Sequence, residues 1–139
     1  MTENEYIFTS ESVSEGHPDK ICDQISDAIV DYYLSNCNLP EKARVACETM
    51  VTSNKVVIAG EVRGDGELKN IDNNKIESIA RRVIKTIGYE QETFHWNKVE
   101  VNVNLHEQSP DIGRGVDAVE KNQEGAGDQG IMFGYASNE

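Results

Sequence analysis

The sequence predicts an α+β fold whose elements follow the order β-α-β-β-α-β. Two stretches have the apolar periodicity of amphipathic helices, and several runs have the composition or the alternation of strands. Strands and helices therefore alternate without the regular β-α repeat of a parallel sheet. With 139 residues, the chain can bury one hydrophobic core.

The first helix is predicted to begin at Pro18, because proline suits the first helical position. Its apolar stripe consists of Ile21, Ile25, Ala28, Ile29 and Tyr32. Four aspartates at i+4 spacing form another face: Asp19, Asp23, Asp27 and Asp31. Such a stripe is more typical of a solvated helix surface than of a metal site, and only Asp19 stands beside the helix start.

The second helix carries an apolar stripe between Ile76 and Ile87, and Gly88 fits the position after its end. We interpret this helix as structural. The predicted strands are Glu5–Thr9, Arg44–Val51, Lys55–Val62 and Val99–Leu105, and Ile131–Ala136 is one further strand. His106 follows the strand Val99–Leu105 on its polar side and is predicted to be solvated.

The two central strands are predicted to form a hairpin. If Ser53–Asn54 is a two-residue turn, Glu48 lies opposite Ala59 and Glu61 lies opposite Ala46. Both carboxylates would then share one face with apolar side chains, where a buried charge requires a cation or an amino group. Two alternatives remain: this face is solvated, or a three-residue turn places the glutamates on opposite faces.

The segment Ser14–Lys20 brings glycine, histidine, proline, aspartate and lysine to the start of the first helix. His17 is the expected N-cap. A helix start carries about half a unit of positive charge and free N–H groups, which favour a phosphate. Lys20 adds a charge, and Asp19 suits a Mg²⁺ ion shared with phosphate oxygens. The alternative is an ordinary helix start, because an aspartate in the first turn is stabilising without any ligand.

Composition limits the function further. A formal charge of −12 argues against binding to nucleic acid or to an anionic membrane, so an anionic substrate needs a local cluster of cations. Cys22, Cys37 and Cys47 have neither disulfide-framework nor zinc-site spacing, which favours a reduced, cytoplasmic setting. No apolar run is long enough to span a membrane, and no targeting signal is recognised.

After the predicted strand Val99–Leu105 comes a segment of about twenty residues without periodicity, from Glu107 to Gly127. A loop of this length is typical of a functional lid or a linker.

Together, five segments resemble the N-terminal part of the S-adenosylmethionine synthetases, or methionine adenosyltransferases: Phe8–Ala28, Ala43–Thr49, Gly60–Glu61, Gln108–Ile112 and Gly125–Ala136. The resemblance implies a mixed sheet with two helices on one face, the first of the family's three related units. It also implies an N-terminal domain at 1–107, a flexible active-site loop at 108–127, and the start of a truncated central domain at 128–139.

The resemblance further implies roles for individual residues. His17 is the catalytic residue and binds ATP beside the departing oxygen, Lys20 also binds ATP, Asp19 is a Mg²⁺ ligand and Glu48 a K⁺ ligand. Glu61, Gln108 and Asp128 bind methionine. The gating loop comprises Gln108, Ser109, Pro110, Asp111, Ile112, Gly113, Arg114, Gly115, Val116, Asp117 and Ala118.

The implied reaction forms S-adenosylmethionine from ATP and L-methionine, after which the released triphosphate is hydrolysed to phosphate and diphosphate. The implied assembly is a homo-oligomer, a dimer or a tetramer, with shared active sites, or a complex with a partner chain that supplies the missing domains. Two alternatives remain: a truncated non-catalytic subunit that assembles with full-length chains, and a generic Mg²⁺–polyphosphate binder.

Overall fold

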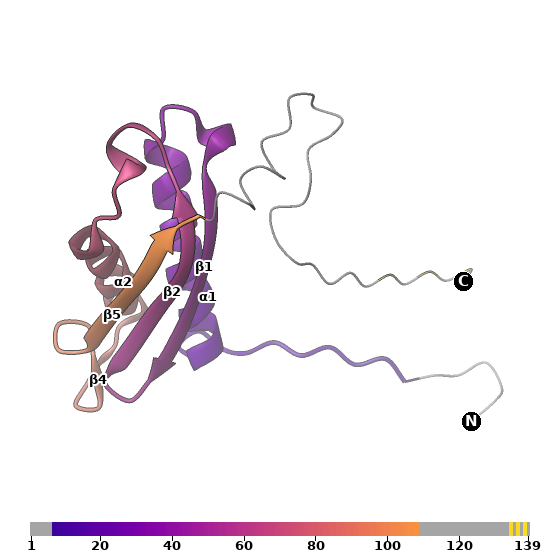
Figure 1. The fold of residues 1–139 in the computed structure, drawn as a ribbon. Helices are drawn as coiled ribbons and strands as arrows, with labels where there is room; N and C mark the ends of the chain where they lie inside the picture. Colours follow the sequence, from indigo (N-terminus) through magenta and orange to yellow (C-terminus); the bar gives the residue numbers. More distant parts are fainter. Residues whose placement is uncertain (1–6, 109–133, 135, 137, 139) are drawn as a thin grey trace.

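The computed structural model describes residues 7–108, 134, 136 and 138. A three-stranded sheet forms one layer, and two helices cover one of its faces (Figure 1). In chain order the helices and strands are α1 (Pro18–Asn36), β1 (Arg44–Thr52), β2 (Lys55–Arg63), α2 (Asn73–Ile87), β3 (Glu90–Gln91), β4 (Phe94–His95) and β5 (Glu100–Glu107), with short 3-10 helices at Pro40–Lys42 and Gly66–Lys69. The predicted α+β class, with a mixed sheet and both helices on one face, is confirmed.

The sheet has the strand order β1-β2-β5, in which β1 and β2 are antiparallel and β2 and β5 are parallel. A parallel pair requires a crossover, and α2 lies in that connection. Glu48 pairs with Ala59 and Glu61 pairs with Ala46, as the two-residue turn predicts. Asn54 adopts a φ of 54° in this turn, a conformation that asparagine tolerates better than most residues.

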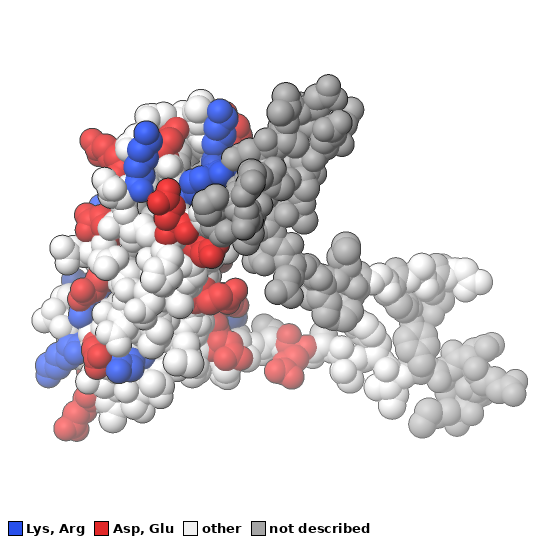
Figure 2. Space-filling view, viewed as in Figure 1, with Lys and Arg blue, Asp and Glu red and all other residues white. Residues whose placement is uncertain are grey.

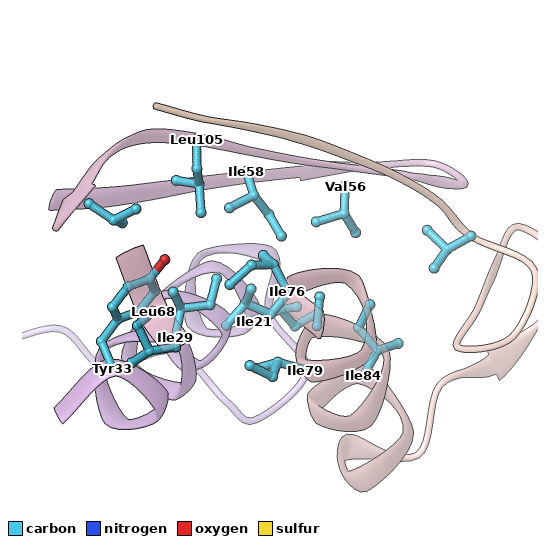
Figure 3. Close-up of a cluster of buried hydrophobic side chains, with 14 of the residues drawn as sticks. Ile21, Ile29, Tyr33, Val56, Ile58, Leu68, Ile76, Ile79, Ile84 and Leu105 are labelled. Carbon is cyan, nitrogen blue, oxygen red and sulfur yellow. The ribbon is translucent and has the colours of Figure 1, made fainter. Parts of the chain in front are cut away.

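The core lies between the sheet and the helices (Figure 3). Val56, Ile58 and Leu105 point from the strands toward Ile21 and Ile76 of the helices. Burial of this continuous apolar set is the main force that holds the two layers together.

Helix α2 is closed at both ends, and Arg81 ties it to the sheet. Asp72 accepts hydrogen bonds from two first-turn amides, and Gly88 ends the helix in the left-handed conformation with a φ of 97°. The Arg81 guanidinium donates to the carbonyls of Trp96 at 2.9 Å and Val99 at 2.8 Å. The predicted structural role of this helix agrees with these contacts.

Two strand predictions have other outcomes. Residues 7–9 of the predicted strand Glu5–Thr9 form no strand, and Ile7 and Phe8 are 79% and 75% exposed. Their aromatic and β-branched composition predicted a strand, but a strand also needs a neighbour to receive its hydrogen bonds, and these residues lie outside the sheet. The predicted strand Ile131–Ala136 lies outside the described residues apart from two isolated positions.

The pair β3–β4 was not predicted, because strands of two residues are too short to show periodicity. The division at residue 107 stays a prediction, since nearly all of 108–139 lies outside the described residues. None of the helices in the described part of the chain is long and apolar enough to cross a membrane.

Candidate functional site

The start of α1 has the geometry that its sequence predicts. His17 is the N-cap in an extended conformation, and its Nδ1 accepts a hydrogen bond from the Asp19 amide at 3.1 Å. Pro18 occupies the first helical position. The His17 and Asp19 side chains are 43% and 82% exposed, so a ligand can reach both. This helix entrance, defined as Ser14–Lys20, therefore combines the positive end of the helix dipole with an accessible imidazole and carboxylate.

Two side chains hold the loop that leads into this entrance. Lys20 Nζ donates to the Val13 carbonyl at 2.5 Å, and the Tyr89 hydroxyl donates to the Gly16 carbonyl. An ammonium has three donors, so the bond to Val13 leaves others for a phosphate. Sequence reasoning missed Tyr89, because the aromatic residue after a helix-ending glycine reads only as an apolar contact.

The other aspartates of α1 remain on the exposed surface, as predicted: Asp23, Asp27 and Asp31. Among the residues that the structure describes, no cluster of three or more His, Cys, Asp or Glu side chains could hold a metal ion. Any metal at the helix entrance must therefore take its remaining ligands from substrate, water or other parts of the protein.

The two hairpin glutamates lie on the face of the sheet turned away from the helices. Ser26 of α1 shares a hydrogen bond of 2.9 Å with Thr49 of β1, so Thr49 faces the helices and its neighbour Glu48 faces away. Glu61 lies on the same side as Glu48, because Glu48 pairs with Ala59 and side chains alternate along β2. We call this the open face.

The shared face and its apolar neighbours are confirmed, but the premise that this face is buried is wrong for the described structure. Met50 on this face is 60% exposed, Glu48 is exposed and Glu61 is half-buried. No desolvation therefore forces a cation onto these carboxylates. Figure 2 shows the sheet side of the molecule, with largely uncharged surface over the strands and acidic groups among it. His106 is exposed on the same face, as predicted.

Gln108 lies at the same end of the sheet as Glu61. The backbone N–H of Gln108 donates to the Val62 carbonyl at 3.0 Å, and the preceding residue of β2, Glu61, pairs with His106. The side-chain oxygen of Gln108 is buried and accepts no hydrogen bond from any described residue. The structure therefore brings two of the three predicted methionine ligands to one sheet end.

Asp128 and the predicted gating residues 109–118 lie outside the described residues.

The helix entrance and the glutamates are not brought together. Pro18 and Ile21 line a hollow of about 360 Å³ with Val51 and Ser53, which places the helix entrance at the hairpin end, on the helix side of the sheet. Glu61 lies near the opposite end of β2 and on the open face. Within a single chain, the helix entrance and Glu61 therefore lie on different sides of the sheet.

The cysteines supply no activated nucleophile. Burial raises the pKa of Cys47 to about 11, and burial likewise raises the pKa of Cys22. Both thiols stay protonated at neutral pH, whereas the thiolate is the reactive form. All three cysteines are free.

Comparison with known proteins identifies the family. The model described as "S-adenosylmethionine synthetase, N-terminal domain" matches residues 5–110. S-adenosylmethionine synthases of Parvibaculum lavamentivorans and Rhodospirillum centenum are 59% and 57% identical over 139 residues, covering 100% of this chain and 34% of each relative. The chain thus spans about a third of the length of these relatives.

A solved structure, an unusual S-adenosylmethionine synthetase from Campylobacter jejuni, has a TM-score of 0.63 and 40% identity, covering 77% of this chain and 28% of that one. Sequence and fold therefore agree, and the chain belongs to the S-adenosylmethionine synthetase family, in which it corresponds to the N-terminal domain.

Proposed function

We propose that the chain is the N-terminal portion of a methionine adenosyltransferase, which forms S-adenosylmethionine from ATP and L-methionine. The observation that carries this proposal is 59% identity over the whole chain to a protein named S-adenosylmethionine synthase. In the proposed reaction, a lone pair of the methionine sulfur attacks C5′ of ATP. The C5′–O bond breaks, its electron pair leaves with triphosphate, and a sulfonium forms. Hydrolysis of triphosphate to phosphate and diphosphate follows.

The helix entrance suits the leaving group of this reaction. Negative charge grows on triphosphate as the C5′–O bond breaks, and N–H dipoles aimed at that charge stabilise the transition state. His17 lies at this entrance with an exposed imidazole, and Lys20 adds a positive charge. A thioether needs no deprotonation before attack, so the absence of an activated nucleophile among the cysteines is compatible with the reaction.

Asp19 fits a Mg²⁺ ion that is shared with triphosphate. Its carboxylate is 82% exposed, and Mg²⁺ in proteins is commonly held by one or two carboxylates together with substrate phosphates and water. Bound there, Mg²⁺ would neutralise charge on the phosphate oxygens. Asp19 would supply the protein ligand, and the His17 imidazole and the Lys20 ammonium at the same entrance would orient the same phosphates.

Glu48 does not by itself fit a K⁺ site. It offers one exposed carboxylate, and its neighbours across the strands are Ala59 and, on β5, Asn104. A K⁺ site at Glu48 therefore needs oxygen ligands from outside the described residues.

Glu61 and Gln108 are proposed to bind the methionine substrate. Their location at one sheet end and the unsatisfied buried oxygen of Gln108 support this role, because an amino acid offers an ammonium donor to such acceptors. Asp128 is proposed to add a second carboxylate, and residues 108–118 are proposed to gate the site.

The opposite placement of the helix entrance and Glu61 supports a shared active site. One chain presents them on different sides of the sheet, so a complete site needs a second copy or further protein to bring another helix entrance to the open face. We propose a homo-oligomer, a dimer or a tetramer, as this assembly. The free thiols support a reducing compartment such as the cytoplasm.

A non-catalytic subunit that assembles with full-length chains is the second candidate. It is favoured by the small supply of cations at the helix entrance, where Lys20 already binds the Val13 carbonyl.

The test has two arms. The chain is first incubated with ATP, methionine, Mg²⁺ and K⁺, and S-adenosylmethionine is measured by mass spectrometry. It then replaces the matching third of the Parvibaculum lavamentivorans relative, and the chimera is assayed in the same way. Product from the chimera supports the proposal, and a folded chimera without product would overturn it.

If the chimera forms S-adenosylmethionine and the chain alone does not, the activity depends on the remaining two thirds of the protein. A monomeric chain that never joins full-length subunits argues against the non-catalytic subunit. ATP binding without methionine binding, in both the chain and the chimera, would favour the generic polyphosphate binder.

A further inference from the structure

Tyr89 connects the end of α2 to the entrance of α1. It follows Gly88, the residue that ends α2, and its hydroxyl donates a hydrogen bond to the Gly16 carbonyl, 73 positions earlier in the sequence. Gly16 has a φ of 89°, and a Cβ at this position would lie 3.4 Å from the Tyr89 hydroxyl. A Cβ would therefore fit beside the hydroxyl, and it is the positive φ that favours glycine at this position.

The Tyr89 ring is itself held in place. It packs edge-to-face on Phe94, with centroids 5.1 Å apart and an interplanar angle of 81°. The Tyr89 amide donates to the Ile84 carbonyl at 3.2 Å, and the Tyr89 carbonyl accepts from the Trp96 amide at 3.1 Å. With its ring packed and both backbone groups bonded, Tyr89 presents its hydroxyl from a fixed position.

The contact fixes the peptide group that precedes His17. The Gly16 carbonyl and the His17 amide belong to one planar peptide unit. Tyr89 binds its oxygen, while the His17 amide donates to the Ser14 carbonyl at 3.1 Å. Hydrogen bonds on both sides restrict the rotation of this unit, and therefore the direction in which His17 leaves the backbone.

The orientation of His17 determines which ring nitrogen carries the proton. Nδ1 accepts from the Asp19 amide at 3.1 Å, so in the neutral imidazole the proton is on Nε2. Protonation of Nδ1 would remove this acceptor, and the Asp19 carboxylate, at 3.9 Å, is too far to replace the bond. The cap therefore selects a donor nitrogen, Nε2–H, which has no partner among the described residues.

We propose that Tyr89 is a positioning residue that fixes the Gly16–His17 peptide and thereby holds His17 as a preset Nε2–H donor at the helix entrance. Its meaning for catalysis depends on the proposed function, in which this donor meets the departing triphosphate. The positioning itself is a property of the ligand-free chain, so it can be tested without activity.

The test compares Tyr89→Phe with Tyr32→Phe in the full chain. Tyr89→Phe removes the hydroxyl and keeps the ring on Phe94. Tyr32→Phe removes a hydroxyl from the other end of α1, where the ring contacts Tyr33 and Lys75. ¹⁵N chemical shifts, measured at a pH above which they no longer change, report the tautomer of neutral His17. Hydrogen exchange reports how well the Asp19 amide is protected by its hydrogen bond.

For Tyr89→Phe we expect a smaller Nε2–H fraction and about threefold to tenfold faster exchange at Asp19, the ordinary effect of one lost hydrogen bond. Exchange at Ile29 and Ile58 should not change, and Tyr32→Phe should match the wild type at His17. An unchanged His17 tautomer, or exchange that rises equally in the core, would overturn the proposal.

Gly16→Ala approaches the same contact from the other side. Alanine is strained at a φ of 89°, so the Gly16–His17 peptide should shift, and we expect the same changes at His17 with Tyr89 intact. A normal His17 tautomer in this variant would count against the proposal.

The active chimera separates positioning from general stability. Tyr89→Phe should lower kcat about threefold to tenfold with little change in the KM for methionine. When His17 is already Asn, Tyr89→Phe should have no further effect, whereas a merely structural role would lower kcat again. An inactive chimera with the expected His17 signature would contradict the proposed function and leave the positioning role intact.

Discussion

The two faces of the β1-β2-β5 sheet are completed in different ways. On the covered face, Ile58 is 0% exposed and packs between the strands and the helices (Figure 3). On the open face, Met50 is 60% exposed and Glu48 is exposed. The chain's own helices bury the covered face, whereas no described helix packs on the open face.

This difference matters for function because each face carries one half of the proposed site. The helix entrance belongs to the helix layer and is held by hydrogen bonds within the chain, including those from Tyr89 and Lys20. The carboxylates of Glu48 and Glu61 lie on the open face. The half proposed for triphosphate is therefore formed within the chain, whereas the half proposed for methionine depends on what meets the open face.

The largest effect should come from truncation of the covered face. Ile58→Ala removes buried methyl groups and leaves a cavity, so the free energy of unfolding should fall by about 2 to 5 kcal/mol. Met50→Ala, on the open face, should change it by less than about 0.5 kcal/mol in dilute protein. Urea unfolding followed by circular dichroism measures both.

The same pair tests whether another chain covers the open face. In an oligomer that uses this face, Met50→Ala should weaken association, and its effect on stability should grow with protein concentration. A concentration-independent loss of several kcal/mol for Met50→Ala would show that Met50 belongs to the core of the single chain, which contradicts the comparison.

The next effect concerns the helix entrance in the active chimera. His17→Ala removes both the cap and the imidazole, and kcat should fall about 100-fold or more, as for the loss of one donor to a transition-state anion. His17→Asn is the matched variant, because asparagine is a good N-cap and keeps the helix start. It should regain the stability of the helix but not the rate.

Thermal unfolding and kcat, measured on both variants, separate the two roles. If His17→Asn restored the rate to within a few-fold of wild type, His17 would serve only as a helix cap.

Local signals explain which of these features could be predicted. Pro18 and Gly88 mark helix ends through their own backbone preferences, and both positions are confirmed. The register that places Glu48 and Glu61 on one face follows from a two-residue turn, which is also confirmed. In each case the signal lies within a few residues of the feature.

Features that depend on distant residues could not be predicted. Strand β2 is apolar on both faces, with Val57 beside Ile58, so periodicity did not show which face the helices cover. The apolar neighbours of Glu61 therefore suggested burial, whereas the structure leaves that face open. The bond from Tyr89 to Gly16 spans 73 positions and has no local signature.

A smaller effect should distinguish the two carboxylates of the open face. In the active chimera, Glu61→Gln should raise the KM for methionine about tenfold, the ordinary scale for one hydrogen bond to a charged group, with a smaller change for ATP. Glu48→Gln is the matched variant, because it removes the same charge from the same face. It should alter the dependence of activity on K⁺ more than the KM for methionine. Equal effects of the two variants on methionine would remove the assigned division of roles.

The smallest effect is a pH dependence that reports the covered face alone. Cys47 is the neighbour of Glu48 on β1 and faces the helices, and burial raises its pKa from 9.0 to about 11. Because the folded state holds this proton more tightly, its stabilising contribution is complete below pH 9 and is lost as the pH rises from about 9 to about 11. The urea midpoint, measured under reducing conditions, should therefore fall across this range.

The control is Cys47→Ala. Burial also raises the pKa of Tyr33 to about 12, so part of the fall in the urea midpoint should remain in this variant, with a shallower slope. An identical slope in wild type and Cys47→Ala would mean that water reaches this thiol, and that the helices cover this side of β1 less tightly than the contrast between the two faces requires.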